Sequence, residues 1–519
     1  MLSRQLNYSK TPFLFYSALI ITLVLSAFYR LQFDFNTGHI DEYGYLFVGK
    51  TLLAGKTWGT YNYIFGSDLN WYLFGIGDKY FGGLEGARIV SGFLGLISLA
   101  GFYIFVKTLW GSTQISVIAT ILLSTQAVHI FISRFATYDI TSLMFFTLSL
   151  APLILACREK DKIHYTYLIT AIAFFSLAIT SKYITILYLP FICLIALSYN
   201  KTVAFLFGLG ISLILALYAT LHWEGLKELY EIQISGVHVA NSTYQDVAVV
   251  ISKYLSLPLF FFTIAVIWLF WGLPRTVGPT KAKIFWTFLS LVILALPIAL
   301  YHLRAQNIIS LYKHLAFSLV FLIPIIAWFL STFLDHLKNR HAPQILGVII
   351  ITGIVVLNLS HLQAMESRYP NLSEMIKSVE HDLGSKPDQT ILTEDSYLFR
   401  YLAFDKMPQN TIKNTRWVDN NLDGKHEMKD VHNAIWDSKF TYVYLNDRFH
   451  FYKNEKIREI LKQRGYELIK EKPYSLPWDK DTYNQRKLSL YKRINEPAVP
   501  FEQDQLFNRK FKSAGKQND

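Results

Sequence analysis

Two adjacent acids, Asp41 and Glu42, stand about ten residues beyond the first long hydrophobic segment of the chain. A pair of carboxylates at a membrane surface is costly to keep without a chemical use. Such a pair can take a proton from a nucleophile, so it predicts an enzyme that works at the outer face of a bilayer. The alternative is that Asp41 caps the helix that follows it, where free amides and the helix dipole favour an acid.

Further charged side chains stand at the ends of later hydrophobic segments. Arg134 and Asp139 precede one segment, and Lys182 falls between two segments with almost no loop. Around the ends of two later segments lie His302, Arg304, Lys313 and His314. Taken singly, such residues more often mark the end of a span or reach the membrane surface along an aliphatic stem. Together they fit a reaction on an anionic lipid headgroup, in which acids activate a nucleophile and cations hold a leaving phosphate.

The composition indicates where these residues must sit. Of 519 residues, 52% are hydrophobic and only 17% are charged, against about 25% in a soluble enzyme. Residues 1–363 hold 23 Lys/Arg and 14 Asp/Glu, and residues 364–519 hold 27 and 24. We therefore expect a membrane domain over 1–363 and a polar globular domain over 364–519. The net charge of +12 belongs mostly to the membrane part, which argues against nucleic-acid binding and for basic cytoplasmic loops.

Apolar stretches long enough to cross about 30 Å of hydrocarbon recur throughout the first part. They predict about eleven spans near 12–31, 87–106, 115–132, 140–157, 165–180, 183–199, 202–221, 254–272, 284–302, 312–332 and 344–363. The first is preceded by Arg4 and Lys10 and lacks a small-residue cleavage site, so it is expected to be a retained anchor. The two cysteines, Cys157 and Cys193, both fall in predicted spans, so no disulfide framework is expected.

The loops predict the orientation of the chain. Short basic loops, expected in the cytoplasm with the N-terminus, include 158–162, 273–283 and 338–340. The opposite segments, 32–86, 133–139, 222–253 and 303–311, are longer or richer in acids. An odd number of spans then places 364–519 outside a bacterial or archaeal plasma membrane.

The sequence also predicts helices that lie in the membrane interface and a small domain of strands and helices. Segments 41–55 and 68–81 are aromatic but too short to span, and are expected to lie as helices in the interface within the first outer loop, 32–86. Strand-like alternation occurs at 390–395, 440–445, 466–471 and 487–493, with helix-like segments at 396–404 and 454–464. This pattern predicts a small α/β domain.

The ordered series of motifs resembles the GT-C integral membrane glycosyltransferases. It comprises the Asp-Glu pair, a Gly-x-x-Gly-Ala-Arg-x-x-Ser entry to the second span at 83–91, Arg-x-x-x-x-Asp at 134–139, and Thr-Ser-Lys-Tyr at 180–183. Within that superfamily the series is most similar to the protein O-mannosyltransferase and lipid A aminoarabinose transferase branch. The resemblance covers about residues 8–200, and residues 200–363 match only in hydrophobic rhythm.

The resemblance implies an inverting transfer from a polyprenyl-phosphate-linked sugar to a hydroxyl of a protein, lipid or glycan. By that analogy Asp41 is the general base, Glu42 supports it, and Asp139 shapes the sugar or acceptor pocket. Cations expected to bind the departing phosphate are Lys182, Arg134, Arg304 and Lys313. Side chains expected to line the acceptor and sugar pocket are His39, Tyr45, Tyr138 and His302. The resemblance implies no cofactor, although Asp41, Glu42 and Asp139 are oxygen ligands suited to a divalent cation.

Two other functions fit parts of the sequence. A transporter or lipid flippase would carry charges or glycine breaks at mid-membrane and internal repeats. Here the charges gather at one face, and Gly208-Leu209-Gly210 is the one obvious interior break. A lipid-linked polysaccharide polymerase or ligase, still a transferase, could use a long outer loop such as 222–253.

Overall fold

The computed structural model divides the chain into two compact units. It describes residues 12–32, 40–56, 67–158, 163–230, 242–271, 278–308, 310–336, 342–366, 371–380, 383, 388–415, 418, 428–437, 439–474 and 486–494. The first unit comprises Met1–Phe33 and Val48–Met365, and the second comprises Asp34–Phe47 and Glu366–Asp519. The boundary therefore runs through a single helix, α2 (Ile40–Leu53).

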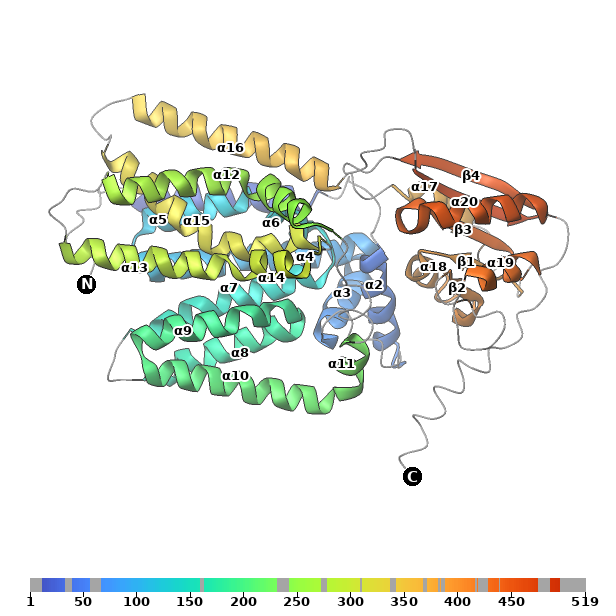
Figure 1. The fold of residues 1–519 in the computed structure, drawn as a ribbon, viewed down its shortest axis with the longest axis horizontal. Coiled ribbons are helices and arrows are strands. Elements are labelled where there is room, and N and C mark those ends of the chain that lie inside the picture. The colour runs from blue at the N-terminus through green and yellow to red at the C-terminus, as the bar shows by residue number, and fades with distance from the viewer. Residues whose placement is uncertain are drawn as a thin grey trace. The chain divides into compact units, whose positions relative to one another are not determined.

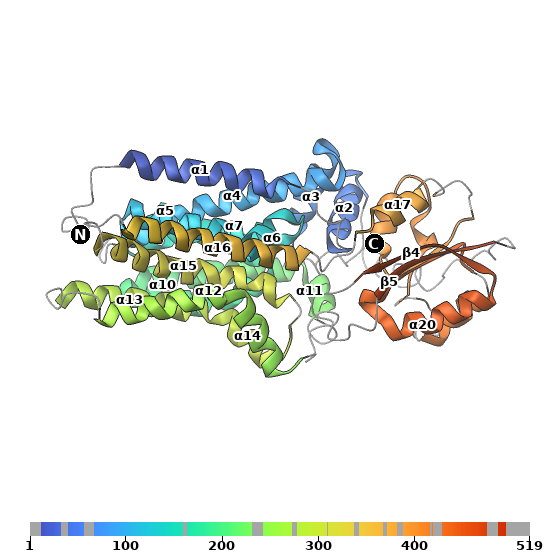
Figure 2. The same ribbon diagram turned by 90° about the horizontal axis from the view of Figure 1, so that it is seen from above.

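The first unit is a bundle in which most of the long helices share a common direction (Figure 1). Its helices, besides the second half of α2, are α1 (Pro12–Arg30), α3 (Asp68–Phe81), α4 (Gly83–Trp110), α5 (Thr113–Ser124), α6 (Ala127–Arg134), α7 (Tyr138–Ala156), α8 (Tyr165–Ser181), the 3-10 helix η3 (Tyr183–Tyr188), α9 (Leu189–Tyr199), α10 (Lys201–Leu221), α11 (Trp223–Leu229), α12 (Tyr244–Trp271), α13 (Gly278–Ala295), α14 (Pro297–Ala305), α15 (Leu311–His336) and α16 (Ala342–Glu366). Seen from above, α1 runs alongside α4 and α5 (Figure 2).

Each of the eleven predicted spans coincides with one helix or with two consecutive ones. Among the described residues, six helices are long and apolar enough to cross a membrane, or up to seven when the bent pair α5–α6 counts as one span. The predicted polytopic helical membrane protein is confirmed. Helix α12 begins at Tyr244, earlier than the predicted span at 254–272. Its start is fixed by a reciprocal cap, in which the Thr243 N–H donates to Asp246 Oδ2 (2.9 Å) and the Asp246 N–H donates to Thr243 Oγ1 (3.2 Å).

Both segments predicted to be interfacial helices are helical. They form α2 and α3, and α3 has the predicted bounds. In the first unit the second half of α2 crosses α3 at two glycines. A Cβ on Gly49 would lie 2.5 Å from the carbonyl oxygen of Trp71 and 2.8 Å from the Cα of Gly75. Only the missing side chains let the two backbones approach so closely.

The second unit contains a five-stranded sheet in the order β2-β1-β3-β5-β4. Its strands are β1 (Ile391–Thr393), β2 (Ile412–Asn414), β3 (Tyr442–Asn446), β4 (Tyr466–Tyr474) and β5 (Arg486–Arg493). Its helices, besides the first half of α2, are α17 (Ser373–Glu380), α18 (Ser396–Leu402), α19 (Met428–Trp436) and α20 (Asp447–Gln463), with a short 3-10 helix η5 (Gln409–Thr411). β1 pairs in parallel with β2 and β3, and β5 pairs antiparallel with β3 and β4. The predicted α/β domain is confirmed, and β2, α17 and α19 are additions to the prediction.

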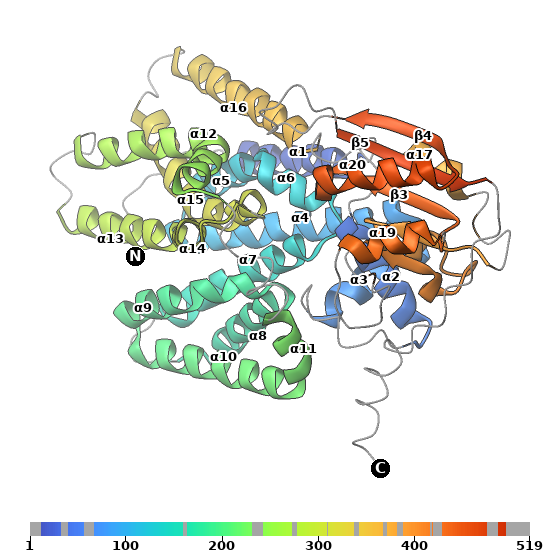
Figure 3. The same ribbon diagram turned by 45° about the vertical axis from the view of Figure 1, so that its right-hand side comes forward.

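Both faces of the sheet are covered at β1 and β3, whose residues are all buried. Leu392, Val443 and Leu445 pack in one core with apolar residues of α19 and α20, which lie on the same side of the sheet in Figure 3. On the other face, the Tyr444 ring packs edge to face on Phe399 of α18, with centroids 5.3 Å apart. Around the fully buried strands β1 and β3 the domain therefore has three layers, with helices on both faces of the sheet.

Candidate active site

Asp139 is the centre of a buried polar cluster in the first unit. It lies in the first turn of α7, and its side chain is 1% exposed. The Thr137 hydroxyl, just before the helix, donates to Asp139 Oδ2 at 2.9 Å. The open amides and dipole at the helix start also favour a carboxylate here. Asp139 is therefore held as an anion with a fixed orientation.

Lys182 reaches this carboxylate from the break between α8 and η3. Its backbone is extended (φ −149°, ψ 109°), so the chain leaves one helix and enters the next within a single residue. Lys182 Nζ forms an ion pair with Asp139 Oδ1 and lies 4.3 Å from the centroid of the Tyr138 ring. The Ser142 hydroxyl, which donates to the Ala178 carbonyl at 2.8 Å, fastens α7 to α8 beside this pair.

A second cation comes from the start of α15. Lys313 Nζ lies 3.7 Å from Asp139 Oδ2, and its side chain is 10% exposed. Two ammonium groups thus meet one carboxylate, one from the break after α8 and one from α15, in a part of the protein closed to water. Such a buried charge cluster is a poor source of stability, because desolvation offsets much of the attraction. It is better explained by a use for concentrated positive charge.

Two hydrogen-bonded histidines stand next to Lys313. His302 Nδ1 lies 2.7 Å from the Asn307 carbonyl oxygen, and His302 Nε2 lies 2.8 Å from His314 Nδ1. Because the carbonyl can only accept, His302 carries a proton on Nδ1. A neutral His302 then accepts on Nε2 from the N–H of His314. The carbonyl therefore fixes the tautomers of both rings.

Arg134 and Arg304 have other surroundings. Arg134, at the end of α6, is buried, and its Nη2 donates to the Gln32 carbonyl at 2.5 Å. Arg304 lies on the exposed side of α14, two residues from buried His302. Residues two apart on a helix face different directions. Within the described residues, neither arginine has an ion pair with Asp139.

The remaining predicted residues belong to the second unit. Asp41 and Glu42 occupy the first turn of α2, with Asp41 half-buried and Glu42 and Tyr45 fully buried. His39 falls outside the described residues. The structure therefore brings together Asp139, Lys182, Lys313 and Tyr138. The association of the Asp41-Glu42 pair with them stays a prediction.

A buried series of hydrogen bonds around Arg30 was not predicted from the sequence. At the end of α1, Arg30 is fully buried; its Nη2 donates to the Ser124 carbonyl (3.3 Å) and to His129 Nδ1 (2.7 Å). Because His129 Nδ1 accepts, its proton is on Nε2, which lies 3.5 Å from the Ser98 hydroxyl. The signal was present in the sequence, since His129 is an ionisable residue inside a predicted span.

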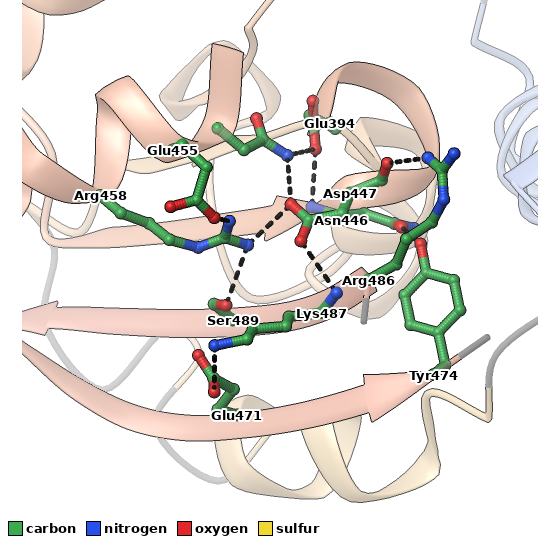
Figure 4. Close-up of polar contacts among 11 residues, drawn as sticks. Glu394, Asn446, Asp447, Glu455, Arg458, Glu471, Tyr474, Arg486, Lys487 and Ser489 are labelled. Carbon is green, nitrogen blue, oxygen red and sulfur yellow. Dashed lines mark hydrogen bonds and ion pairs between the residues drawn. The ribbon is translucent and has the colours of Figure 1, made fainter. Parts of the chain in front are cut away.

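The second unit has a polar cluster of its own, at the carboxyl ends of β1 and β3 (Figure 4). Asp447, the residue after β3, accepts hydrogen bonds from Arg458 Nη2 (2.7 Å) and from the backbone N–H of Lys487 (2.8 Å). Arg458 also pairs with Glu455 at 2.6 Å. These bonds join α20 to β5 and fix the end of β3.

Glu394, the residue after β1, is the unusual member of this cluster. Its Oε2 accepts from the backbone N–H of Asn446 (2.6 Å) and from Asn454 Nδ2 (3.1 Å). Its Oε1 has no hydrogen-bond partner among the described residues. Burial, reinforced by the nearby charges of Asp395 and Asp447, raises the pKa of Glu394 to about 8, although both hydrogen bonds favour the charged form. Glu394 is therefore mostly protonated at neutral pH.

Among the residues that the structure describes, no three His, Cys, Asp or Glu side chains are grouped so that they could hold a metal ion.

Comparison with known proteins finds one family model that matches about a third of the chain. Residues 36–205 match the family model described as dolichyl-phosphate-mannose-protein mannosyltransferase. This range contains the acid pair, Asp139 and Lys182. No curated protein matches the sequence.

Solved structures match almost the whole chain. ArnT from Cupriavidus metallidurans bound to undecaprenyl phosphate superposes with a TM-score of 0.56 and 11% identity, covering 95% of this chain and 100% of that one. The chain has the GT-C glycosyltransferase fold. The apo state of the same ArnT gives a TM-score of 0.54 at 12% identity, over 94% of this chain and 98% of that one.

A second GT-C protein also matches. The Archaeoglobus fulgidus oligosaccharyltransferase, tethered to an acceptor peptide containing the NVT sequon, gives a TM-score of 0.55 at 12% identity, covering 88% of this chain and 73% of that one. The predicted resemblance to the GT-C superfamily is thus confirmed.

Proposed function

We propose that this protein transfers a sugar from a polyprenyl-phosphate-linked donor to a hydroxyl of a protein, lipid or glycan, at the outer face of the membrane and with inversion. The observation that carries the proposal is the pair of buried ammonium groups, Lys182 and Lys313, joined through Asp139 in the first unit. A departing phosphate needs concentrated positive charge, and ammonium groups withdrawn from water supply it most strongly.

The reaction is a single displacement. The acceptor hydroxyl oxygen attacks the anomeric carbon while the bond from that carbon to the phosphate oxygen breaks. Asp41 takes the hydroxyl proton, Glu42 orients Asp41 or the acceptor, and the polyprenyl phosphate leaves with the bonding electron pair. Lys182 and Lys313 neutralise it, assisted by Arg134. Attack from the side opposite the phosphate inverts the anomeric configuration.

The other proposed roles keep those that the resemblance implies. Tyr138, over which the Lys182 ammonium lies, and His302 are proposed to line the sugar pocket, and Tyr45 and His39 are the acceptor and sugar residues that the resemblance adds. Asp139 holds both lysines and shapes this pocket. Arg304, exposed on α14, is better placed to meet lipid headgroups than the reacting phosphate. No metal is needed in this scheme, since the cations of the chain carry the charge.

The test begins by identifying the substrates. Mass spectrometry of membrane lipids and surface glycans from wild-type and deletion cells should reveal an unused polyprenyl-phosphate sugar and a missing glycan. With that donor, purified Lys182→Ala should lose far more donor-dependent turnover than Lys182→Arg, because a phosphate requires a cation there.

The matched control is Lys107→Ala. Lys107 is also a partly buried lysine at a helix end, in the last turn of α4, where it donates to the Thr113 hydroxyl. Its loss should leave turnover unchanged. If Lys182→Ala and Lys107→Ala had the same kinetics as wild type, the lysine pair could not be the phosphate site.

A further inference from the structure

The helix that carries the acid pair packs, within the second unit, against the C-terminal sequence. Tyr43 and Phe47 of α2 are 4% and 1% exposed. The Tyr43 ring lies 5.6 Å from that of Tyr401, and the Phe47 ring lies 6.3 Å from that of Tyr397 and 5.9 Å from that of Phe404. We call Tyr397, Tyr401 and Phe404 the aromatic cradle.

Gly44 lets α2 settle into this cradle. The three atoms nearest to a Cβ placed on Gly44 would all belong to the Tyr397 ring, at 3.6 to 3.9 Å, which is ordinary contact distance. An alanine therefore fits, whereas a longer side chain must push the ring away. Gly44 is two residues from Glu42 and three from Asp41, within one helical turn. A displacement at Gly44 is therefore passed directly to the two acids.

The cradle itself is anchored to the sheet. Its helix, α18, starts right after Glu394 and Asp395, where Asn446 Nδ2 donates to Asp395 Oδ2 (3.0 Å). Asn414 Nδ2 donates to the Glu394 carbonyl (3.1 Å) and to the Ser396 hydroxyl (3.2 Å). The far side of α18 is held by Phe399 against Tyr444. Side chains supported in this way hold a neighbouring group within the narrow limits that catalysis needs.

We propose that the aromatic cradle positions Asp41 and Glu42, so that orienting the proton-accepting pair is the role of the C-terminal domain in the transfer reaction. This inference rests on the proposed function. Tyr397, Tyr401 and Phe404 are positioning residues: they touch the acid-bearing helix through its apolar face and leave the chemistry to Asp41. A misplaced general base is a kinetic defect, and a displacement of about 1 Å can cost about a hundredfold in rate.

The experiment uses full-length protein in detergent, with kcat and donor KM measured per folded molecule. Gly44→Ala and Tyr397→Phe should stay within about twofold of wild type, because the first adds only a contact and the second keeps the ring. Gly44→Leu and Tyr397→Ala should lower kcat by about tenfold to a hundredfold and leave donor KM unchanged. Trp436→Ala removes a half-exposed ring of the same domain that packs on Arg464 and is the matched control with wild-type kcat.

Other outcomes overturn the inference in distinguishable ways. Wild-type kcat in Gly44→Leu and Tyr397→Ala, beside an inactive Asp41→Asn, would remove the cradle from the mechanism and leave the proposed function intact. A raised donor KM with unchanged kcat would make the cradle part of donor binding and refute positioning. Full activity of Asp41→Asn would refute both proposals. If Tyr397→Ala does not fold, Phe404→Leu, which keeps an apolar side chain, decides the question with the same readout.

Discussion

Replacing Glu394 by glutamine should abolish a pH dependence of stability in the second unit. The folded state holds the Glu394 proton up to about pH 8, whereas the unfolded chain releases it near 4.5. Between these values the folded state binds more protons than the unfolded one, so the free energy of unfolding falls as pH rises. The contribution of Glu394 to the free energy of unfolding is constant below about pH 4.5 and again above about pH 8.

The magnitude follows from the width of the window. Each pKa unit corresponds to about 1.4 kcal/mol, so the full shift of Glu394 amounts to about 5 kcal/mol between pH 4.5 and 8. Glutamine is neutral at every pH and keeps an oxygen for the N–H groups of Asn446 and Asn454, so it resembles protonated glutamate. The variant should lack this slope and should be the more stable protein at pH 8.

Hydrogen exchange measured by mass spectrometry can report this locally in the full-length protein. Peptides covering β3 should show an opening free energy that falls by about 1.4 kcal/mol per pH unit between pH 5 and 7.5 in wild type, after correction for intrinsic exchange rates. Glu455→Gln, the same substitution at an exposed residue of the cluster, should retain the slope. A flat wild-type profile, or an equal slope in Glu394→Gln, would refute the reasoning.

Three further predictions concern the proposed chemistry, the topology and the packing. Asp41→Asn should fold and bind donor yet lose turnover, because a general base contributes about 10²–10⁴-fold; retention of more than about a tenth of wild-type turnover would exclude that role. In a background without Cys157 and Cys193, cysteines at positions 68, 236 and 425 should react with an impermeant reagent in intact cells, and those at 161 and 278 only after permeabilisation; external labelling at 161, or protection at 425, would show a miscounted span. Gly49→Ala should destabilise the protein by about 1–3 kcal/mol, since its Cβ would lie 2.5 Å from a backbone oxygen, whereas Gly353→Ala, with nothing within 4 Å, should leave its melting temperature unchanged or higher.

The parts of the fold that the sequence predicted are those with strong local signals. The apolar runs located every long helix of the first unit, and even the short aromatic helix α3 was predicted with its observed bounds. β2 was missed because it has only three residues, of which Ile412 alone is buried. α19 was missed because the helix is only nine residues long and its sequence has no clear helix-start signal.

The sequence predicted which residues belong to the candidate site better than it predicted which of them lie close together. Asp139 and Lys182 were expected at one face because both end predicted spans, and the structure joins them. Arg304 was grouped with His302 by proximity in sequence, although a helix turns the two in different directions. The packing of α2 on the cradle had no local signal. Tyr43 and Phe47 suit a membrane interface equally well, and their partners lie about 350 residues further along the chain.

The contacts of Arg30 bear on how the protein is made. This guanidinium, fully buried in the finished protein, bonds to groups 94 and 99 residues later in the chain. At a synthesis rate of about 5–20 residues per second, those partners emerge about 5–20 seconds after α1 does. During that interval the first helix must keep its cation at the membrane surface, reaching along its aliphatic stem. The native packing of α1 can therefore form only after α5 and α6 have been made. The first segment to be inserted is thus one of the later ones to reach its native environment.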